Sequence, residues 1–380
     1  MKRVAFEAST LLPPRGRPLL ERHAGLHDAL PAVTLASLPT PVTEHAALAD
    51  GRCAGLLVKR DDRVATPYGG NKIRKLEFLL GAARAAGAKH VMTFGVAGSN
   101  HALATAVCAA RTGLRGVSLL TPQTNARYVA KNLRMSLAAG AELHYYKSQR
   151  EADAGARFQR LRLKRRSGAM PALVPGGGSS ALGTVGFVNA ALELAEQVDA
   201  GVLPVPDRLY VALGTMGTVA GLALGLRLAG LPTRVVAVRV VHENIANAAR
   251  LQQLLTQTAA LLSDAGVAVP PEAAQAESVD IRHECFGRKY AVFTDAGMAA
   301  IERAAAHDIT LDGTYTGKAF AALLGDLDSG ALHGRTALFW NTYSSAELSP
   351  WIEGVDDREL PPPLRWYVEA PVQRRDRAPR

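Results

Sequence analysis

The sequence predicts an α/β protein whose parallel sheets are flanked by helices. Along most of its 380 residues, short apolar runs alternate with longer alanine-rich stretches of helical character. Such alternation is typical of parallel sheets, because each parallel connection has to cross back over the sheet. No period of about 20 to 50 residues repeats, which argues against solenoids and propellers. There are more strand–helix units than one small sheet needs, so we expect two domains.

The expected elements follow a proline-rich arm. Residues 1–50 are weakly periodic and predict an extended arm with short helices that lies against the body. A strand at 56–58 is followed by a turn, and a helix with one apolar face begins near Asn71. Further strands are predicted at 90–94, 116–121, 142–146, 172–174, 209–213, 235–241 and 337–340, and further helices at 100–111, 126–139, 183–198 and 219–228.

Charge argues against a nucleic-acid partner. The chain has 44 Lys and Arg against 34 Asp and Glu, a net charge of +10, but this charge is mostly dispersed. A dense run at 160–166 lies on a predicted helix, and residues 374–380 form a basic tail, which we interpret as a solvated face and a frayed terminus. No helix-turn-helix, zinc finger or aromatic-rich RNA motif accompanies them, so we expect no nucleic-acid binding.

Cysteine usage and hydropathy indicate the compartment. Cys53, Cys108 and Cys285 are far apart and odd in number, so they predict neither a disulfide framework nor a metal site. No apolar stretch approaches the length of a membrane span. We therefore expect a soluble cytoplasmic protein with no membrane partner.

The first candidate site is Gly69-Gly70-Asn71-Lys72, where a glycine turn brings a lysine to the start of a helix. The positive end of a helix dipole disfavours the ammonium form, and a neutral amine suits Schiff-base chemistry. The alternative is a surface lysine on an amphipathic helix, which this segment alone favours.

The second candidate is Gly95–His101, between a strand and a helix. Ligands bind at the carboxyl ends of parallel strands, where the free N–H groups of the next helix can hold a carboxylate or phosphate. Ser99 and Asn100 can equally form a simple helix cap. His101 is either a proton carrier or a buried structural histidine.

The third candidate is the loop Gly214-Thr215-Met216-Gly217-Thr218, also between a strand and a helix. Glycines let the backbone approach an anion and threonine hydroxyls add donors, so the loop predicts a phosphate site. It matches neither the Walker nor the dinucleotide pattern, and a bare tight turn is the alternative. The run Gly176–Ser180 is interpreted as a flexible connection.

Two polar loops complete the set. Thr314–Lys318, which contains Tyr315, precedes a helix, and Asn341–Ser345, which contains Thr342, follows the last strand. Each alone is an ordinary loop. Together, a lysine, two anion-binding loops and a hydroxyl-rich strand end indicate one active site.

In order, Gly69-Gly70-Asn71-Lys72-Ile73-Arg74-Lys75-Leu76-Glu77, Ser99-Asn100-His101, the glycine-rich run 214–221 and Tyr315-Thr316-Gly317-Lys318 resemble the D-cysteine desulfhydrase / 1-aminocyclopropane-1-carboxylate deaminase family over residues 35–350. The resemblance implies the tryptophan-synthase-β-like fold of pyridoxal 5'-phosphate (PLP) enzymes, fold type II. It implies that Lys72 forms a Schiff base with PLP and Asn100 bonds the 3′ oxygen of PLP. It also implies that Gly214, Thr215, Met216, Gly217 and Thr218 hold the phosphate, and that Ser99, Asn100 and His101 receive the substrate carboxylate.

The resemblance also implies the domain organisation. A large PLP-binding domain would comprise residues 1–84 and 191–380, and a small α/β domain, residues 85–190, would be inserted into it. PLP would lie in the cleft between the domains. Members of this family commonly form dimers, so we expect a homodimer.

Within the family, the residues favour the desulfhydrase branch. The deaminase pattern has glutamine at position 101 and glutamate at position 316, where this chain has His101 and Thr316. Phe286 stands where a tyrosine is expected, which suggests that the second phenol of the deaminase site is lost. Without a carboxylate at 316, the pyridine nitrogen would meet a hydroxyl such as that of Thr342, and a neutral pyridine is a weaker electron sink.

The sequence therefore predicts a PLP-dependent lyase that acts on a small amino acid, with β-elimination to a 2-oxo acid and ammonia. Lys72 would be the base, Ser99 would position the carboxylate or relay a proton, and Tyr315 would face the leaving group. Ring-opening deamination, β-replacement and a non-catalytic small-molecule binder remain alternatives. Tyr343 and Ser344 replace two glycines of the family pattern, so the pocket is expected to be reshaped.

Overall fold

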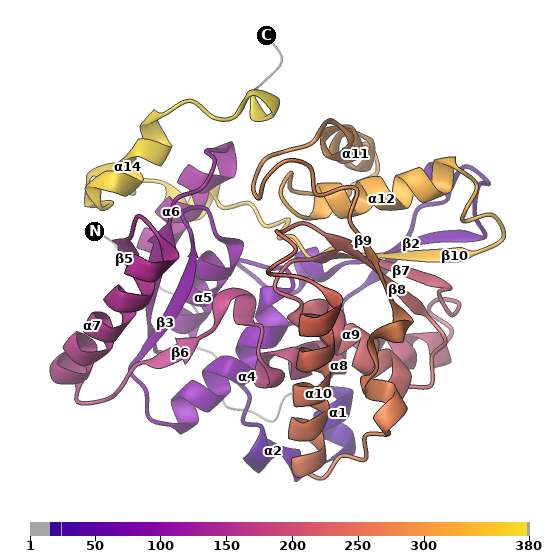
Figure 1. Ribbon diagram of the computed structural model, residues 1–380, viewed down its shortest axis with the longest axis horizontal. Helices are drawn as coiled ribbons and strands as arrows, with labels where there is room; N and C mark the ends of the chain where they lie inside the picture. The colour runs from indigo at the N-terminus through magenta and orange to yellow at the C-terminus, as the bar shows by residue number, and fades with distance from the viewer. Residues whose placement is uncertain (1–15, 24, 378–380) are drawn as a thin grey trace.

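Two sheets form the framework of the protein (Figure 1). The computed structural model describes residues 16–23 and 25–377. The six-strand sheet has the order β1-β2-β10-β7-β8-β9, and the four-strand sheet has the order β5-β4-β3-β6. The strands are β1 (Val42–Glu44), β2 (Gly55–Lys59), β3 (His90–Val96), β4 (Arg115–Thr121), β5 (Glu142–Tyr145), β6 (Ala172–Val174), β7 (Arg208–Leu213), β8 (Arg234–Arg239), β9 (Val279–Arg282) and β10 (Thr336–Trp340).

Nearly every strand pairing is parallel, as expected. In the large sheet, β10 inserts between β2 and β7, so that Leu338 is opposite both Leu57 and Leu209. β1 is the exception, because it pairs antiparallel with β2 (Thr43 opposite Val58). The arm thus adds an edge strand that its weak periodicity did not reveal, and residues 1–15 of the arm lie outside the described part of the chain.

Helices cover both faces of each sheet. They are α1 (Pro18–Arg22), α2 (Leu26–Ala29), α3 (Ala46–Ala49), α4 (Lys72–Ala85), α5 (Asn100–Arg111), α6 (Arg127–Ala138), α7 (Gln149–Ser167), α8 (Ala181–Asp199), α9 (Gly217–Leu228), α10 (Ala248–Asp264), α11 (Asp295–Ala305), α12 (Thr316–Asp328), α13 (Ser349–Ile352) and α14 (Pro362–Glu369). On the small sheet, Leu163 of α7 packs against Met92 of one face, whereas Leu103 of α5 packs with Val91 of the other. On the large sheet, α9 packs with Val235 and α12 with Val236.

A buried ionic cluster fixes the helix that carries Lys72. The Arg74 guanidinium bonds Asp61 and Glu193 at 2.8 Å each. Lys59 also binds Glu193, at 2.6 Å, and the two cations lower the pKa of this carboxyl to about 2. Breaking one partner of a buried pair leaves an uncompensated charge, so the start of α4 is firmly held against β2 and α8.

The expected division into two domains remains a prediction. The strands of the small sheet all lie between His90 and Val174, while those of the large sheet lie on both sides of this range. The expected boundary at residue 190 falls inside the continuous helix α8, which packs closely on α9.

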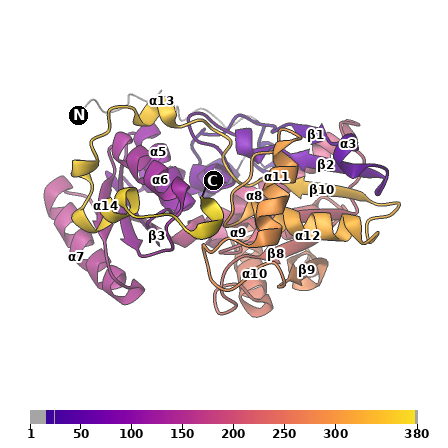
Figure 2. The same cartoon turned by 90° about the horizontal axis from the view of Figure 1, so that it is seen from above.

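The basic C-terminal segment is bonded to the body, although its arginines are exposed, and its interpretation as a frayed terminus is wrong for residues 374–377. Arg375 pairs with Asp295 at 2.8 Å, and the Asp376 carboxylate accepts from Arg127 at 3.1 Å. Figure 2 shows this segment running from α14 over the small sheet toward α11. Residues 378–380 lie outside the described part.

Within residues 16–23 and 25–377, no helix is both long and apolar enough to cross a membrane.

Candidate active site

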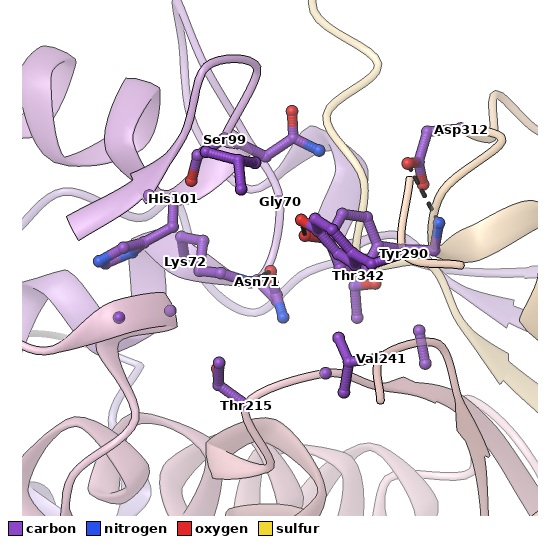
Figure 3. A pocket seen from close by; sticks show the side chains of 18 of the residues that line it. Gly70, Asn71, Lys72, Ser99, His101, Thr215, Val241, Tyr290, Asp312 and Thr342 are labelled. Atoms are coloured by element: carbon purple, nitrogen blue, oxygen red, sulfur yellow. Dashed lines mark hydrogen bonds between the residues drawn. The ribbon is translucent and has the colours of Figure 1, made fainter. Parts of the chain in front are cut away.

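A pocket of about 600 Å³ lies where the carboxyl ends of strands from both sheets meet. Its walls come from the start of α4, the β3–α5 loop, the β7–α9 loop, residues 312–316 and the loop after β10. Figure 3 shows Lys72 and His101 on one side of it and Tyr290 and Asp312 on the other. Parallel α/β sheets bind ligands at this edge, so the position matches the expectation from the strand–loop–helix motifs.

Lys72 is half-buried in the pocket wall as the first residue of α4. Its Nζ donates a hydrogen bond to Asn71 Oδ1 at 2.8 Å. Burial lowers the pKa of Lys72 to about 8, although the Asp312 carboxylate opposes the shift. A sizeable fraction of this amine is therefore neutral near pH 8, as nucleophilic chemistry requires.

Close backbone packing places the Lys72 turn. Gly70 has φ +87°, and a Cβ there would lie 2.9 Å from the backbone oxygens of both Thr342 and Tyr343. The Asn71 amide donates to Thr342 O at 3.1 Å, and Asn71 Nδ2 donates to Thr218 Oγ1 at 2.8 Å. These contacts join the turn before Lys72 directly to the loop after β10 and to the glycine-rich loop 214–218.

Ser99 and Asn100 start α5 at the edge of the pocket. Ser99 caps the helix, because its Oγ accepts from the Ala102 amide at 3.1 Å. Asn100 Oδ1 accepts from Asn132 Nδ2 at 2.9 Å. Ser99 therefore forms the helix cap that was the alternative interpretation. The start of α5 nevertheless lines the pocket, and the positive end of the helix dipole would favour a carboxylate there.

His101 is buried and neutral. Thr93 Oγ1 donates to Val174 O and shares a hydrogen bond with His101 Nε2, at 2.9 Å each. Burial, with Lys72 and Lys75 nearby, holds the pKa of His101 well below its usual range. His101 lines the pocket without being charged at neutral pH, which favours the structural alternative over a proton carrier.

The predicted phosphate loop lines the pocket through Gly214, Thr215, Met216 and Thr218. Met216 adopts φ +69° as it caps α9. Gly217 is not among the lining residues, and its amide donates to Ser179 Oγ at 3.1 Å. A Cβ at Gly217 would lie 2.8 Å from Ser179 Oγ and 3.0 Å from Lys75 Nζ, so only glycine fits there without displacement.

Lys75 is a site residue that the sequence analysis missed. Its buried Nζ donates to Gly177 O and Ser179 Oγ at 3.2 Å each, and no ion pair holds it among the described residues. Burial and the neighbouring Lys72 depress the pKa of Lys75 well below its usual range. Its spacing of three residues from Lys72 was the available signal, because such residues share a helix face.

The glycine run 176–178 is part of the site, and its interpretation as a flexible connection is wrong. Gly176 and Gly177 line the pocket opposite the β7–α9 loop. A Cβ on Gly177 would lie 2.0 Å from Thr215 Oγ1. The run is glycine-rich because two loops approach each other closely around Lys75.

A pair of phenols faces the pocket, and the inference that the second phenol is lost is wrong. The hydroxyls of Tyr290 and Tyr315 share a hydrogen bond, and both residues line the pocket. Phe286 instead lies outside the lining, with its ring against Arg239 and Lys318. The second phenol comes from four residues farther along the same loop.

The Asp312 carboxylate also lines the pocket and was not predicted. It accepts hydrogen bonds from the backbone amides of Thr314, Tyr315 and Thr316 and from Thr316 Oγ1, at 2.8 to 3.2 Å. It therefore caps the start of α12, and burial raises its pKa. Thr316 is engaged with this carboxylate, while Thr342 lines the pocket as expected.

The donors of this pocket fit PLP. Lys75 and the hydroxyl residues Thr215 and Thr218 line one pocket, and Ser179 Oγ bonds both Lys75 Nζ and Thr215 Oγ1, so these donors would stabilise a phosphate dianion. Lys72 Nζ, with its lowered pKa, provides an amine for a carbonyl carbon. The buried Lys75 amine has no carboxylate partner among the described residues, and an anionic ligand would supply the counter-charge that favours its protonated form.

Comparisons with known proteins agree with this chemistry. A family model described as pyridoxal-phosphate dependent enzyme matches residues 33–342. The chain is 39% identical over 346 residues to a nocardicin C-9' epimerase of Nocardia uniformis subsp. tsuyamanensis, covering 90% of this chain and 99% of that protein. It is 34% identical over 302 residues to a D-cysteine desulfhydrase of Salmonella schwarzengrund, covering 77% of this chain and 88% of that protein.

Solved structures share the architecture. The structure of an ACC deaminase homologue superposes with a TM-score of 0.73 at 30% identity, covering 88% of this chain and 96% of that chain. A fungal L-serine ammonia-lyase from Rhizomucor miehei shares the fold, with a TM-score of 0.55 and 18% identity over 85% of this chain and all of that one.

Proposed function

The chain belongs to the family of pyridoxal-phosphate dependent enzymes, and from this premise we propose that it catalyses β-elimination from a small amino acid to a 2-oxo acid and ammonia. The observation that carries the proposal is that Lys72, the helix start at Ser99 and the Tyr290–Tyr315 pair line a single pocket. Its cofactor is PLP, which when bound withdraws electrons from the α-carbon of the amino acid.

We propose that two parts of the chain hold this cofactor. Lys72 Nζ would bind it covalently, and Asn100 would bond its 3′ oxygen. Gly214, Thr215, Met216, Gly217, Thr218 and Lys75 would hold the phosphate. The loop amides and the Lys75 ammonium support this assignment, because charge-assisted hydrogen bonds to a dianion are the stronger class. Thr342 would lie beside the pyridine nitrogen.

Lys72 would then serve as the base for the α-proton. Burial lowers the pKa of its amine to about 8, close to the range in which a general base works best near neutral pH. The first-turn amides of α5, beginning at Ser99 and Asn100, would orient the substrate carboxylate, with His101 packed behind them as a neutral ring. The proton leaves the α-carbon to Lys72 Nζ.

Tyr315 and Tyr290 would serve the leaving group. Burial raises the pKa of Tyr290 to about 12 and raises that of Tyr315 further above its usual range, so both phenols stay protonated at neutral pH. As the bond from the β-carbon breaks, its electron pair leaves with the β-substituent, which takes a proton from the phenol pair. Addition of water to the remaining unsaturated amine yields the 2-oxo acid and ammonia.

A substrate panel tests this proposal. We expect the purified enzyme to release pyruvate from at least one of D-cysteine, L-cysteine, β-chloroalanine and serine, and little 2-oxobutanoate from 1-aminocyclopropane-1-carboxylate. Efficient release of 2-oxobutanoate would overturn the choice of reaction. The choice of β-elimination over ring opening now depends on Thr316, because Tyr290 supplies the second phenol that was expected at position 286.

Epimerisation at the α-carbon is the second candidate function. A relative at 39% identity is a nocardicin C-9' epimerase, and Lys72 and Tyr290 lie on different sides of the pocket (Figure 3). Inversion needs proton removal on one face and delivery on the other, and needs no leaving group. Incubation in D2O distinguishes the two reactions: epimerisation gives α-deuterated amino acid of inverted configuration without pyruvate, and elimination gives pyruvate.

We further propose a cytoplasmic homodimer. The three described cysteines are free thiols, which supports a reducing compartment. Sedimentation equilibrium of the holoenzyme would test the dimer, and a mass of one chain, 40.2 kDa, would contradict it.

A further inference from the structure

The C-terminal segment beyond the matched family region reaches both walls of the pocket. The family model ends at residue 342, and residues 367–377, here called the C-terminal strap, follow α13 and most of α14. In Figure 2 the strap passes from α14 to the neighbourhood of α11. The strap therefore connects elements that pack on the small sheet with a loop that packs beside the large sheet.

On the small-sheet side, the strap holds the loop that begins with Gln123. Tyr367 Oη accepts from the Gln123 amide at 2.9 Å, and Asn125 Nδ2 donates to Ala370 O at 2.9 Å. Gln123 lines the pocket, and its side chain accepts from the Gly98 amide and donates to Tyr128 Oη. The C-terminal strap thus supports the pocket wall that contains Gln123, which in turn bonds the residue before Ser99.

On the large-sheet side, one glutamine of the strap brackets the residues after Tyr290. Gln373 Nε2 donates to Ala291 O at 3.0 Å, and Gln373 Oε1 accepts from the Phe293 amide at 2.9 Å. The backbone amide of Gln373 donates to Asn125 O at 3.0 Å. A single residue therefore ties the Tyr290 loop to the opposite wall of the pocket.

Ala291 needs such support because its backbone is left-handed. Its φ is +60°, a conformation that residues with a Cβ rarely adopt, and its side chain is fully buried. Strained backbone persists only where surrounding contacts over-determine it. The two bonds from Gln373 bracket this residue, and Tyr290, directly before it, bonds Tyr315 inside the pocket.

We propose that Gln373 is a positioning residue for the Tyr290 phenol, acting by holding Ala291 in its left-handed conformation. The inference rests on the proposed function, because the phenol matters as a proton donor to the leaving group. Gln373 itself contacts neither substrate nor cofactor. In its absence, Ala291 relaxes toward negative φ and turns Tyr290 away from Tyr315.

The test compares Gln373→Ala, the double variant Gln373→Ala/Ala291→Gly and a matched control in the PLP-loaded enzyme. The control is Gln252→Ala, because Gln252 makes the same two bonds, to Ala274 O and from the Ala276 amide, away from the pocket. Steady-state kinetics are measured with a poor leaving group, and hydrogen–deuterium exchange is followed for residues 290–294.

We expect Gln373→Ala to lower kcat about tenfold or more with KM and PLP affinity within about twofold of wild type, since proton donation contributes at least this much. Exchange at residues 290–294 should rise. Glycine at 291 adopts positive φ freely, so the double variant should recover most of kcat. Gln252→Ala should keep wild-type kcat.

Several outcomes would overturn the inference. Unchanged kcat and exchange in Gln373→Ala, a kcat loss equal to that of Gln252→Ala, or no recovery in the double variant would each do so. A wild type that releases no 2-oxo acid would instead contradict the proposed function. Even then, hydrogen–deuterium exchange still tests the role of Gln373. Unchanged exchange at residues 290–294 in Gln373→Ala would exclude the positioning role, and increased exchange would support it.

Discussion

The hydroxyls of Tyr290 and Tyr315 share a hydrogen bond in the pocket wall, and Tyr290 lies across the pocket from Lys72 (Figure 3). Because each phenol has a raised pKa, the pair holds two protons at neutral pH and can pass one to a departing group. In the proposed reaction, these two residues, separated by 25 positions in the sequence, would act as one acid.

The first prediction concerns this pair. Tyr315→Phe should lower kcat by about 100-fold or more for cysteine or serine, because general acid catalysis contributes about 10²–10⁴-fold. The loss should be much smaller for β-chloroalanine, since chloride leaves without a proton. Phe286→Leu is the control, and a larger loss there than in Tyr315→Phe would contradict the assignment.

The second prediction concerns Gly217. A valine side chain would begin 2.8 Å from Ser179 Oγ and 3.0 Å from Lys75 Nζ, so Gly217→Val should push these two groups away from the phosphate. PLP affinity should fall about 10- to 100-fold, which corresponds to about 1.5–3 kcal/mol for a charge-assisted hydrogen bond. The measurement is PLP titration by fluorescence. Gly325→Val is the control, because a Cβ at Gly325 would have no atom within 4 Å, and this variant should retain wild-type PLP affinity. Equal PLP affinity in the two variants would show that the loop 214–218 is only a turn and does not bind the phosphate.

The third prediction concerns Lys75. Lys75→Met should weaken PLP binding but leave binding of pyridoxal, which lacks the phosphate, within about twofold. The melting temperature of the apo-protein should rise, because the variant removes a buried amine whose protonation is opposed by burial and by Lys72 and that no carboxylate balances among the described residues. Calorimetry with each ligand checks both. Equal weakening for PLP and pyridoxal would show that Lys75 does not serve the phosphate.

The fourth prediction concerns pH. The folded-state pKa of Lys72 is lowered to about 8 by burial, so its neutral, reactive form accumulates as pH rises through about 8. The rate at which apo-protein binds PLP covalently should therefore increase with an inflection near pH 8, measured by stopped-flow absorbance. An inflection above pH 10, the usual range of a lysine, would contradict the structural placement of Lys72.

Much of the fold and part of the site followed from the sequence. The helix over 100–111 was predicted with its bounds, because Ser99 is a strong cap and the apolar positions recur at helical spacing. β1 was missed, since a three-residue edge strand buries too little to show a pattern. The placement of Lys72 and Ser99 in one pocket follows from strand–loop–helix order, which brings loops to one sheet edge. Tyr315 lies between the helices α11 and α12, so this order does not place it.

The missed residues depend on tertiary contacts. Tyr290 lies in an irregular loop, where neither periodicity nor a cap distinguishes it from the nearby Phe286. The Gly176–Gly178 turn has a role only because Thr215, from a distant loop, packs against it. Gln373 acts across the two sheets, and no local pattern predicts such a contact.

The central claim, that Lys72 holds PLP, is tested most directly by borohydride reduction of the yellow holoenzyme followed by peptide mass spectrometry. We predict loss of the visible band and a phosphopyridoxyl adduct on Lys72, with a colourless, inactive Lys72→Ala variant. An adduct on Lys75 or Lys318, or turnover by Lys72→Ala, would contradict the claim.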